Sequence, residues 1–184
     1  NAEQAEAYGE LMHKSIGTLR DCATPTVAMI KGACVGGGLE VAGLCDIRIC
    51  GESSRFGAPI SKLGLVMAYP EISCLRDLVG PQVALEILLE GRIMDAPEAL
   101  KKGLVSRIVA DDEVEAEAMA TARRIADGAP LVHRWHRKFL NRLADPTPLS
   151  DAEKKECFAC FDTGDFRTGY QAFLDKKKPE FKGR

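Results

Sequence analysis

Hydrophobic residues along the chain alternate between short continuous runs and helical repeats. The run at 26–30 (T-V-A-M-I) is apolar and rich in residues that favour strands, which predicts a buried strand. Three glycines at 36–38 follow it, and the apolar stretch 39–44 then predicts a helix. Polar and apolar residues alternate over 46–50, which predicts another strand. The predicted order is therefore strand, glycine turn, helix and strand.

Other apolar residues recur at helical spacing along the chain. They predict a first helix at 2–19, which begins without a capping residue and ends before Thr24-Pro25. Asp95 is expected to cap a short helix that ends at Gly103. The remaining predicted elements are a strand at 104–109 and helices at 81–89, 111–126, 131–143, 151–161 and 166–176.

The segment Gly128-Ala129-Pro130 is the clearest hinge in the chain, because glycine and proline interrupt regular structure. It predicts two domains, 1–128 and 129–184, of which the second is helical. No internal repeat or low-complexity run indicates a further division.

Composition and charge argue against several function classes. The 184 residues are 46% hydrophobic and 28% charged, which supports one well-filled core or two modest ones. The 25 basic and 27 acidic residues leave a net charge of -2 without long blocks of one sign, so we expect no nucleic-acid partner. The longest apolar run, around 41–44, falls short of the ~20 residues of a membrane-spanning helix, so we expect no membrane partner. The odd number of cysteines, seven, predicts reduced thiols and a cytoplasmic location.

Two short motifs contain residue types that bind metals. Cys157 and Cys160 form a single C-x-x-C without a second pair, and His133 and His136 form H-x-x-H among cationic neighbours. Neither motif has a further ligand nearby in the sequence. We therefore interpret both as structural or solvent-exposed and expect no metal.

The glycine turn at 36–38 carries the clearest chemical signal. Glycines let the backbone expose N–H groups, and the following helix adds the positive end of its dipole, so the turn can hold an anion. Leu39-Glu40 does not fit the Gly-Lys-Ser/Thr of a Walker motif, and G-x-G-x-x-G is absent. Such a turn instead suits the enolate oxygen of a deprotonated thioester, with Glu40 moving the proton. The alternative is that the glycines only permit close packing and that Glu40 is an ordinary first-turn acidic residue.

The helix dipole adds an expectation about the charge of Glu40. A carboxylate in the first turn of a helix is stabilised in its ionised form. We therefore expect Glu40 to be ionised and ready to act as a base.

Three segments resemble the crotonase superfamily, the enoyl-CoA hydratases and isomerases: V-A-M-I-K-G-A-C-V-G-G-G-L-E-V-A-G-L-C-D-I-R-I, S-R-F-G-A-P-I-S-K-L-G-L and G-P-Q-V-A-L-E-I-L-L-E-G-R-I-M-D-A-P-E-A-L-K-K-G-L-V. The similarity extends over essentially the whole chain. It implies an α/β fold with a crotonase-like ββα spiral core and a C-terminal helical oligomerisation region, assembled into homotrimers or hexamers. It also implies a coenzyme A thioester as substrate and no other cofactor. The first strands of the spiral have no match, so we expect this chain to be part of a longer one.

The resemblance assigns catalytic roles to two residues and leaves a third position unmatched. It implies that the Gly37 N–H is one oxyanion donor and that Glu40 is the first catalytic glutamate. The family's second glutamate follows the proline of F-G-x-P, whereas Ile60 follows Pro59 here. An isoleucine neither activates water nor relays a proton, so hydration and isomerisation both remain open.

Further candidates for substrate binding follow from the same resemblance. Glu71 is a candidate replacement acid, although a solvated loop carboxylate is the favoured interpretation. Phe173 is a candidate to pack beside adenine and Lys176 to meet CoA phosphates, with a solvated tail as the alternative. The other candidates, which would surround the acyl group, are Gly36, Gly38, Ile60, Met67 and Ala68. Asp46 matches a position that is usually structural.

The sequence therefore supports an enoyl-CoA hydratase/isomerase family enzyme, a lyase or an isomerase, that acts on an acyl-CoA through an oxyanion-stabilised enolate. One alternative is an acyl-CoA-binding member that has lost hydratase activity. Another crotonase-type reaction is a further alternative, although no convincing nucleophile lies near Ile60 in the sequence.

Overall fold

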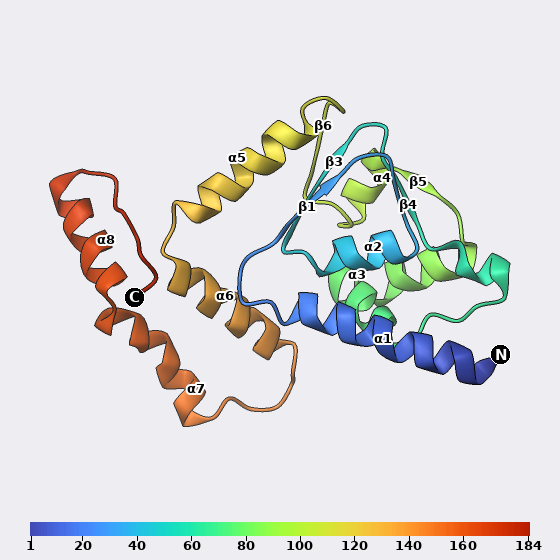
Figure 1. Ribbon diagram of the computed structural model, residues 1–184, viewed down its shortest axis with the longest axis horizontal. Coiled ribbons are helices and arrows are strands. Elements are labelled where there is room, and N and C mark those ends of the chain that lie inside the picture. Colours follow the sequence, from blue (N-terminus) through green and yellow to red (C-terminus); the bar gives the residue numbers. More distant parts are fainter. The chain divides into compact units, whose positions relative to one another are not determined.

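The computed structural model describes all residues, 1–184, and contains helices and short strands (Figure 1). In chain order the elements are α1 (Ala2–Arg20), β1 (Val27–Ile30), β2 (Ala33–Val35), α2 (Gly37–Leu44), β3 (Ile47–Gly51), β4 (Arg55–Gly57), the 3₁₀ helix η1 (Pro59–Leu63), α3 (Tyr69–Glu90), β5 (Met94–Asp95), α4 (Ala96–Lys101), β6 (Arg107–Val109), α5 (Val114–Ala126), α6 (Pro130–Leu143), α7 (Asp151–Glu156), the 3₁₀ helix η2 (Cys157–Asp162) and α8 (Gly164–Asp175). None of these helices is both long and apolar enough to cross a bilayer.

The chain divides into two compact units. The first comprises Asn1–Cys22 and Thr26–Thr121, and the second comprises Ala23–Pro25 and Ala122–Arg184. The division along the chain falls inside α5, a few residues before the predicted hinge at Gly128. The two predicted domains, 1–128 and 129–184, stay a prediction.

Both sheets belong to the first unit. One has the order β1-β3-β6 with parallel neighbours, and Val27 lies opposite Ile47. The other has the order β2-β4-β5, in which β2 and β4 are parallel and β5 is antiparallel to β4. Ile49 of β3 and Phe56 of β4 are fully buried, so both sheets contribute to the hydrophobic interior. In Figure 1, α1, α2 and α3 lie next to one another beside these strands.

Strands β2, β4 and β5 were not predicted. Each has two or three residues, too few to show the alternation of polar and apolar side chains by which a strand is recognised. Their pairing partners lie far away in the sequence, so the tertiary structure determines them. The strands and helices predicted at 26–30, 39–44 and 46–50 are present as β1, α2 and β3.

Helix α3 corrects the prediction for residues 69–80. The pattern predicted a helix only from Pro81, but helical structure already begins at Tyr69 and is interrupted at Gly80, where φ is 77°. Pro70, in the first turn, is compatible with this start because the first N–H groups of a helix need no helical acceptor. The segment that carries Glu71 is therefore a helix and not a loop.

Three helices also differ from prediction at one of their ends. Asn1 does cap α1: its side chain accepts from the Gln4 N–H at 3.0 Å, and the Gln4 side chain reaches back in a capping box. Helix α5 begins at Val114 and not at Asp111, because Asp111 Oδ1 accepts from the Ser53 N–H at 3.1 Å instead. In the C-terminal part, the predicted helix at 151–161 changes to a 3₁₀ helix at Cys157.

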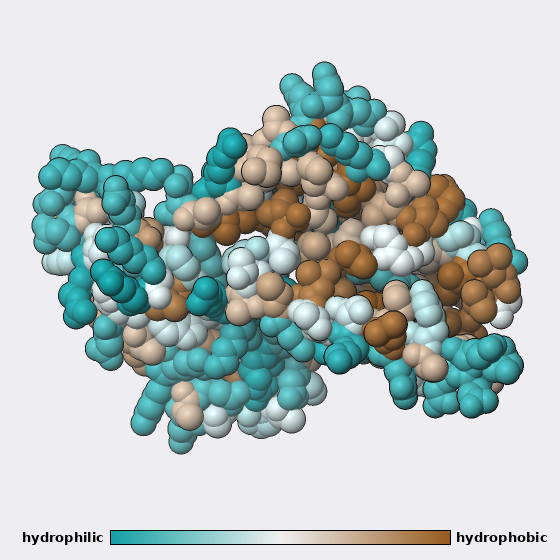
Figure 2. Space-filling view, in the orientation of Figure 1, coloured by the Kyte–Doolittle hydropathy of each residue, from teal (hydrophilic) through white to brown (hydrophobic).

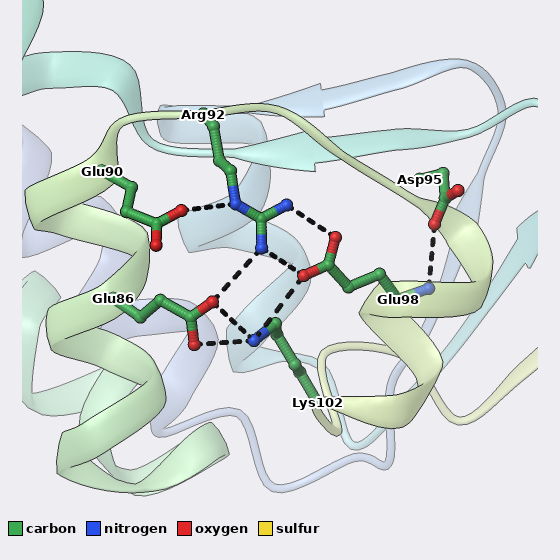
Figure 3. A network of polar contacts seen from close by, with 6 residues as sticks. All are labelled: Glu86, Glu90, Arg92, Asp95, Glu98 and Lys102. Atoms are coloured by element: carbon green, nitrogen blue, oxygen red, sulfur yellow. Dashed lines mark hydrogen bonds and ion pairs between the residues drawn. The ribbon is translucent and has the colours of Figure 1, made fainter.

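Helices α3 and α4 are joined by a network of charged side chains around Arg92 (Figure 3). Its guanidinium bonds Glu90 and Glu98 and lies 3.2 Å from Glu86. Lys102 adds hydrogen bonds of 2.7 and 2.6 Å to both carboxylate oxygens of Glu86. The pKa values of Glu86 and Glu98 are lowered by these hydrogen bonds and charges, from Lys102 first at Glu86 and from Arg92 first at Glu98.

In the second unit, the C-terminal tail is attached to the start of α8. Asp165 is buried, and its carboxylate accepts from the N–H groups of Lys182 and Gly183, each at 2.8 Å. The Asp165 N–H in turn donates to the Arg184 carbonyl at 3.0 Å. These three hydrogen bonds hold the tail against the start of α8 and satisfy the buried carboxylate of Asp165.

Candidate active site

The glycine turn links β2 to the start of α2. Gly36 is the N-cap of α2 with φ 56° and ψ -125°. A residue with a side chain would be strained in this conformation. The Gly36 N–H donates to the Gly57 carbonyl at 2.9 Å, which attaches the turn to β4. The Gly36 carbonyl accepts the N–H groups of Leu39 and Glu40 at 2.9 and 3.1 Å. Gly37 and Gly38, the first residues of the helix, precede the helix's own acceptors, so their N–H groups suit an external oxygen.

A cavity of about 700 Å³ opens at this helix start, lined by residues from α1, α2, η1 and the first turn of α3. This volume falls in the range of ligand pockets, about 300–1,000 Å³. An adjoining smaller space is lined by Gly36, Glu40, Met67 and Glu71. Figure 2 shows hydrophobic surface over the part of the first unit in which these elements lie. The candidate residues that line the larger cavity are Gly37, Glu40, Ile60, Met67, Ala68 and Glu71.

Three other predicted site residues are not part of the lining of the larger cavity. The Gly38 carbonyl accepts the Cys34 thiol at a sulfur–oxygen distance of 3.4 Å, so this group serves the packing of α2 on β2. Phe173, 81% exposed, and Lys176, which ends α8 in a left-handed conformation, belong to the second unit. Their predicted roles in CoA binding stay predictions.

Glu71 corrects a prediction. It was expected to be a solvated loop carboxylate, but its side chain is only 11% exposed and lies in the first turn of α3. Oε1 lies 3.0 Å from Nε2 of His13, and Oε2 is buried without a hydrogen-bond partner. A buried carboxylate oxygen without a partner is costly in a folded protein unless a ligand or a function accounts for it.

The environment of Glu40 also differs from the expectation. The helix dipole was expected to favour its ionised form, but its pKa is raised, first by burial and then by the negative charge of Glu71. The desolvation of the side chain and the second carboxylate therefore outweigh the dipole. A raised pKa moves the carboxyl closer to neutral pH, where a group can both take and return a proton.

His13 is a site residue that the sequence did not reveal. It lies on α1 and lines the same cavity as Glu40 and Glu71. No local motif links it to Glu71, because the two residues lie far apart in the chain and meet only when α1 packs beside α3. A search for ionisable residues on helix faces would have found His13 but not its partner.

The described residues contain no group of three or more His, Cys, Asp or Glu side chains arranged to hold a metal. Nε2 of His133 lies 2.9 Å from the Ile125 carbonyl oxygen. Cys157 and Cys160 carry free thiols, like the other five cysteines. The two motifs noted in the sequence are therefore occupied by local contacts or left as thiols.

Comparison with known proteins places the chain in a family. The family model described as "Enoyl-CoA hydratase/isomerase" matches residues 1–184. The Mycobacterium bovis protein named "Probable enoyl-CoA hydratase echA8" is 35% identical over 183 residues, which are 98% of this chain and 71% of that protein. The "Short-chain-enoyl-CoA hydratase" of Clostridium acetobutylicum is 32% identical over 187 residues, covering 100% of this chain and 72% of the relative. The alternative of a member without chemistry is not favoured by these names.

Solved structures agree with this placement. The crystal structure titled enoyl-CoA hydratase/carnithine racemase from Magnetospirillum magneticum is 55% identical, with a TM-score of 0.97 over 100% of this chain and 69% of that one. The enoyl-CoA hydratase structure from Bacillus anthracis is 28% identical, with a TM-score of 0.93 over 100% and 72%. The predicted α/β fold of the crotonase type is confirmed by these matches. The chain belongs to the enoyl-CoA hydratase/isomerase family.

Proposed function

We propose that the protein acts on an acyl-CoA thioester through an oxyanion-stabilised enolate, with Glu40 moving the α-proton and the Gly37 N–H stabilising the oxyanion. The observation that carries the proposal is that Gly37 and Glu40, in the first turn of one helix, line the same cavity. The cavity can therefore present a hydrogen-bond donor and a proton-transfer group to adjacent atoms of one ligand. The family relationship supplies the substrate class, a coenzyme A thioester, and no other cofactor is part of the proposal.

The chemistry follows from these two groups. The carboxylate of Glu40 takes a proton from the α-carbon, and the C–H electron pair moves into the thioester to form the enolate. The negative charge on the enolate oxygen is stabilised by the Gly37 N–H at the positive end of the α2 dipole. Glu40, now protonated, returns the proton to the substrate. Return to the α-carbon gives α-proton exchange, and return to the γ-carbon of an enoyl chain moves the double bond.

The experiment that tests this proposal uses a panel of trans-2-, cis-3- and trans-3-enoyl-CoA thioesters with the purified protein and Glu40→Gln. Product mass distinguishes added water from a moved double bond. We expect turnover of at least one thioester and a loss of about 10²–10⁴-fold in Glu40→Gln, the usual contribution of a proton-transfer group. CoA binding should survive in the variant. Unchanged turnover in Glu40→Gln would exclude this role of Glu40.

The binding of the CoA moiety is a further part of the proposal. We keep Phe173 as the contact for adenine and Lys176 as the contact for phosphate, because both side chains are exposed on α8. Replacing either by Ala should raise KM for acyl-CoA and leave kcat almost unchanged, since these residues would contact the CoA moiety and not the acyl carbons that react. A fall in kcat with constant KM would contradict the assignment.

Homotrimers or hexamers of a cytoplasmic protein complete the proposal. Large apolar side chains are exposed from α6 to α8, as a subunit-contact region requires: Leu140, Leu143, Phe158, Phe161, Phe166 and Tyr170. Sedimentation analysis should give three or six times the mass of one subunit. A monomer at all concentrations would contradict this part alone.

A further inference from the structure

Glu71 has two oxygens in different surroundings. Oε1 is bound by His13, while Oε2 is buried and has no partner in the protein. A purely structural ion pair would satisfy both oxygens, because leaving a buried polar atom unpaired costs about 1–3 kcal/mol. The carboxylate that carries this unpaired oxygen lines, together with Glu40, both the larger cavity and the small space beside it.

Glu71 and Glu40 share the cavity with apolar side chains and with ionisable residues of α1. Ile60, Met67 and Ala68 contribute apolar surface near them. Ile60 stands at the position where the second carboxylate was expected, and its side chain has no proton to exchange. Two carboxyl groups that line one cavity can act on one ligand, the first by taking a proton and the second by giving one.

We infer that Glu71 supplies the second catalytic carboxylate of this site in place of residue 60, and that His13 of α1 is its positioning residue. The inference rests on the proposed function, because it assigns a partner to Glu40 in the same cavity. It commits the site to a reaction with two proton-transfer groups, the addition of water to an enoyl thioester.

The hydration step balances with these groups. The carboxylate of Glu71 takes one proton from a water molecule while the water oxygen bonds to the β-carbon. The π electrons of the double bond move toward the thioester, which gives the enolate at the Gly37 N–H. Glu40 in its acid form gives its proton to the α-carbon. One proton then passes from Glu71 to Glu40, which restores the starting state, and the substrate has gained one molecule of water.

His13 acts through Glu71 and not on the substrate. Its Nε2 lies 3.0 Å from Oε1, so it holds one oxygen of Glu71 and leaves the other without a protein partner. Its side chain is 35% exposed. It belongs to α1 and not to the glycine turn or the helix that follows the turn. A residue that orients a carboxylate in this way affects the rate of the step in which that carboxylate takes part.

Two reactions separate the role of Glu71 from that of Glu40. The first is hydration of trans-2-butenoyl-CoA, and the second is exchange of the α-protons of butanoyl-CoA in D₂O, which needs Glu40 and Gly37 but no activated water. We expect Glu71→Gln to lower hydration by about 10²-fold or more and to retain exchange, whereas Glu40→Gln loses both. Glu52→Gln, an exposed glutamate between β3 and β4, is the matched control and should leave both rates unchanged.

The outcomes distinguish the inference from the proposed function. Hydration at the normal rate in Glu71→Gln, or loss of exchange as complete as in Glu40→Gln, would overturn the role of Glu71. Wild-type protein that exchanges α-protons but never adds water would overturn it as well and leave the proposed function intact. Wild-type protein that does neither would overturn the proposed function itself. Thermal unfolding of each variant identifies loss of rate that is due to loss of fold.

The positioning role of His13 has its own test. His13→Gln keeps an N–H donor for Glu71, and His13→Leu removes it. We expect slow hydration in His13→Leu, rescue of most of the rate in His13→Gln, and normal α-proton exchange in both. Equal hydration rates in the two variants would show that His13 does not orient Glu71.

Discussion

Asp46 and Thr26 are joined by three hydrogen bonds between the start of β1 and the start of β3. Oδ2 of Asp46 accepts from the N–H of Thr26 at 2.7 Å and from its hydroxyl at 3.0 Å, and the Asp46 N–H donates back to that hydroxyl at 3.1 Å. Asp46 follows α2 directly, so these bonds fix the end of the helix that carries Glu40. This contact explains why Asp46 behaves as a structural residue and not as an acid of the site.

Removing this contact should destabilise the protein. We expect Asp46→Ala to lower the free energy of unfolding by about 0.5–1.5 kcal/mol, the usual net contribution of a hydrogen bond, because the N–H of Thr26 loses its acceptor. Urea unfolding at neutral pH measures the change. Thr26→Ser, which keeps the hydroxyl, is the matched control and should lose less stability than Thr26→Val. Equal stability of Asp46→Ala and wild type would show that water replaces these bonds without cost.

The glycines of the turn should differ in their tolerance of a side chain. An added Cβ meets no atom within 4 Å at either Gly36 or Gly38, but only Gly36 has a positive φ, 56°. We expect Gly36→Ala to cost about 1–2 kcal/mol through backbone strain and to displace the Gly37 N–H. Gly38→Ala should fold as well as wild type or better, because alanine favours a helix. Urea unfolding and α-proton exchange, measured on both variants, test the contrast; similar losses in both would contradict it.

The pH dependence of α-proton exchange should report the coupling of Glu40 and Glu71. Glu40 must be ionised to take the proton, and its pKa is raised by burial and by Glu71. As the pH is lowered, the rate should therefore begin to fall at a pH above the ordinary range of Glu. Glu71→Gln removes one negative charge, so the fall in rate should occur at a lower pH than in the wild-type protein. It should still occur above the ordinary range of Glu, because the burial of Glu40 remains. Other ionisable groups face the cavity and are unchanged in both proteins: Glu6, Glu10 and His13 from α1 and, in the adjoining space, Cys74 from α3. The same pH dependence in Glu71→Gln and in the wild-type protein would show that the two carboxylates do not interact.

Replacing Arg92 should change stability in a pH-dependent way. Hydrogen bonds from Arg92 and Lys102 lower the pKa values of Glu98 and Glu86, so these contacts stabilise the fold above the ordinary pKa of Glu, about 4.3, and the gain is lost as pH falls through and below that value. Arg92→Met should therefore be less stable than wild type at pH 7, and the difference should shrink in acid. Denaturant unfolding at several pH values measures it. Arg76→Met, which loses exposed contacts to the adjacent Asp77 and to the Ser73 hydroxyl, is the control and should show little change at any pH.

The parts of the fold that the sequence predicted correctly share one property: their signal is local. The strand at β1, the turn at 36–38 and α2 follow from residues within a few positions of one another. The cap at Asp95 is similar, because its carboxylate accepts from the Glu98 N–H only three residues away. The missed strands β2, β4 and β5 depend instead on partners far away in the chain.

The candidate site divides in the same way. The amino-acid sequence alone was enough to identify the family and to nominate Gly37 and Glu40 as candidate site residues, because short-range spacing and residue type carry that information. The packing of distant helices was needed to show that Glu71 is buried in a helix, that His13 binds it, and that the pKa of Glu40 is raised by burial and by Glu71. Burial and the approach of charges from distant segments set the energy of an ionisable group, and neither exists until α1, α2 and α3 pack together.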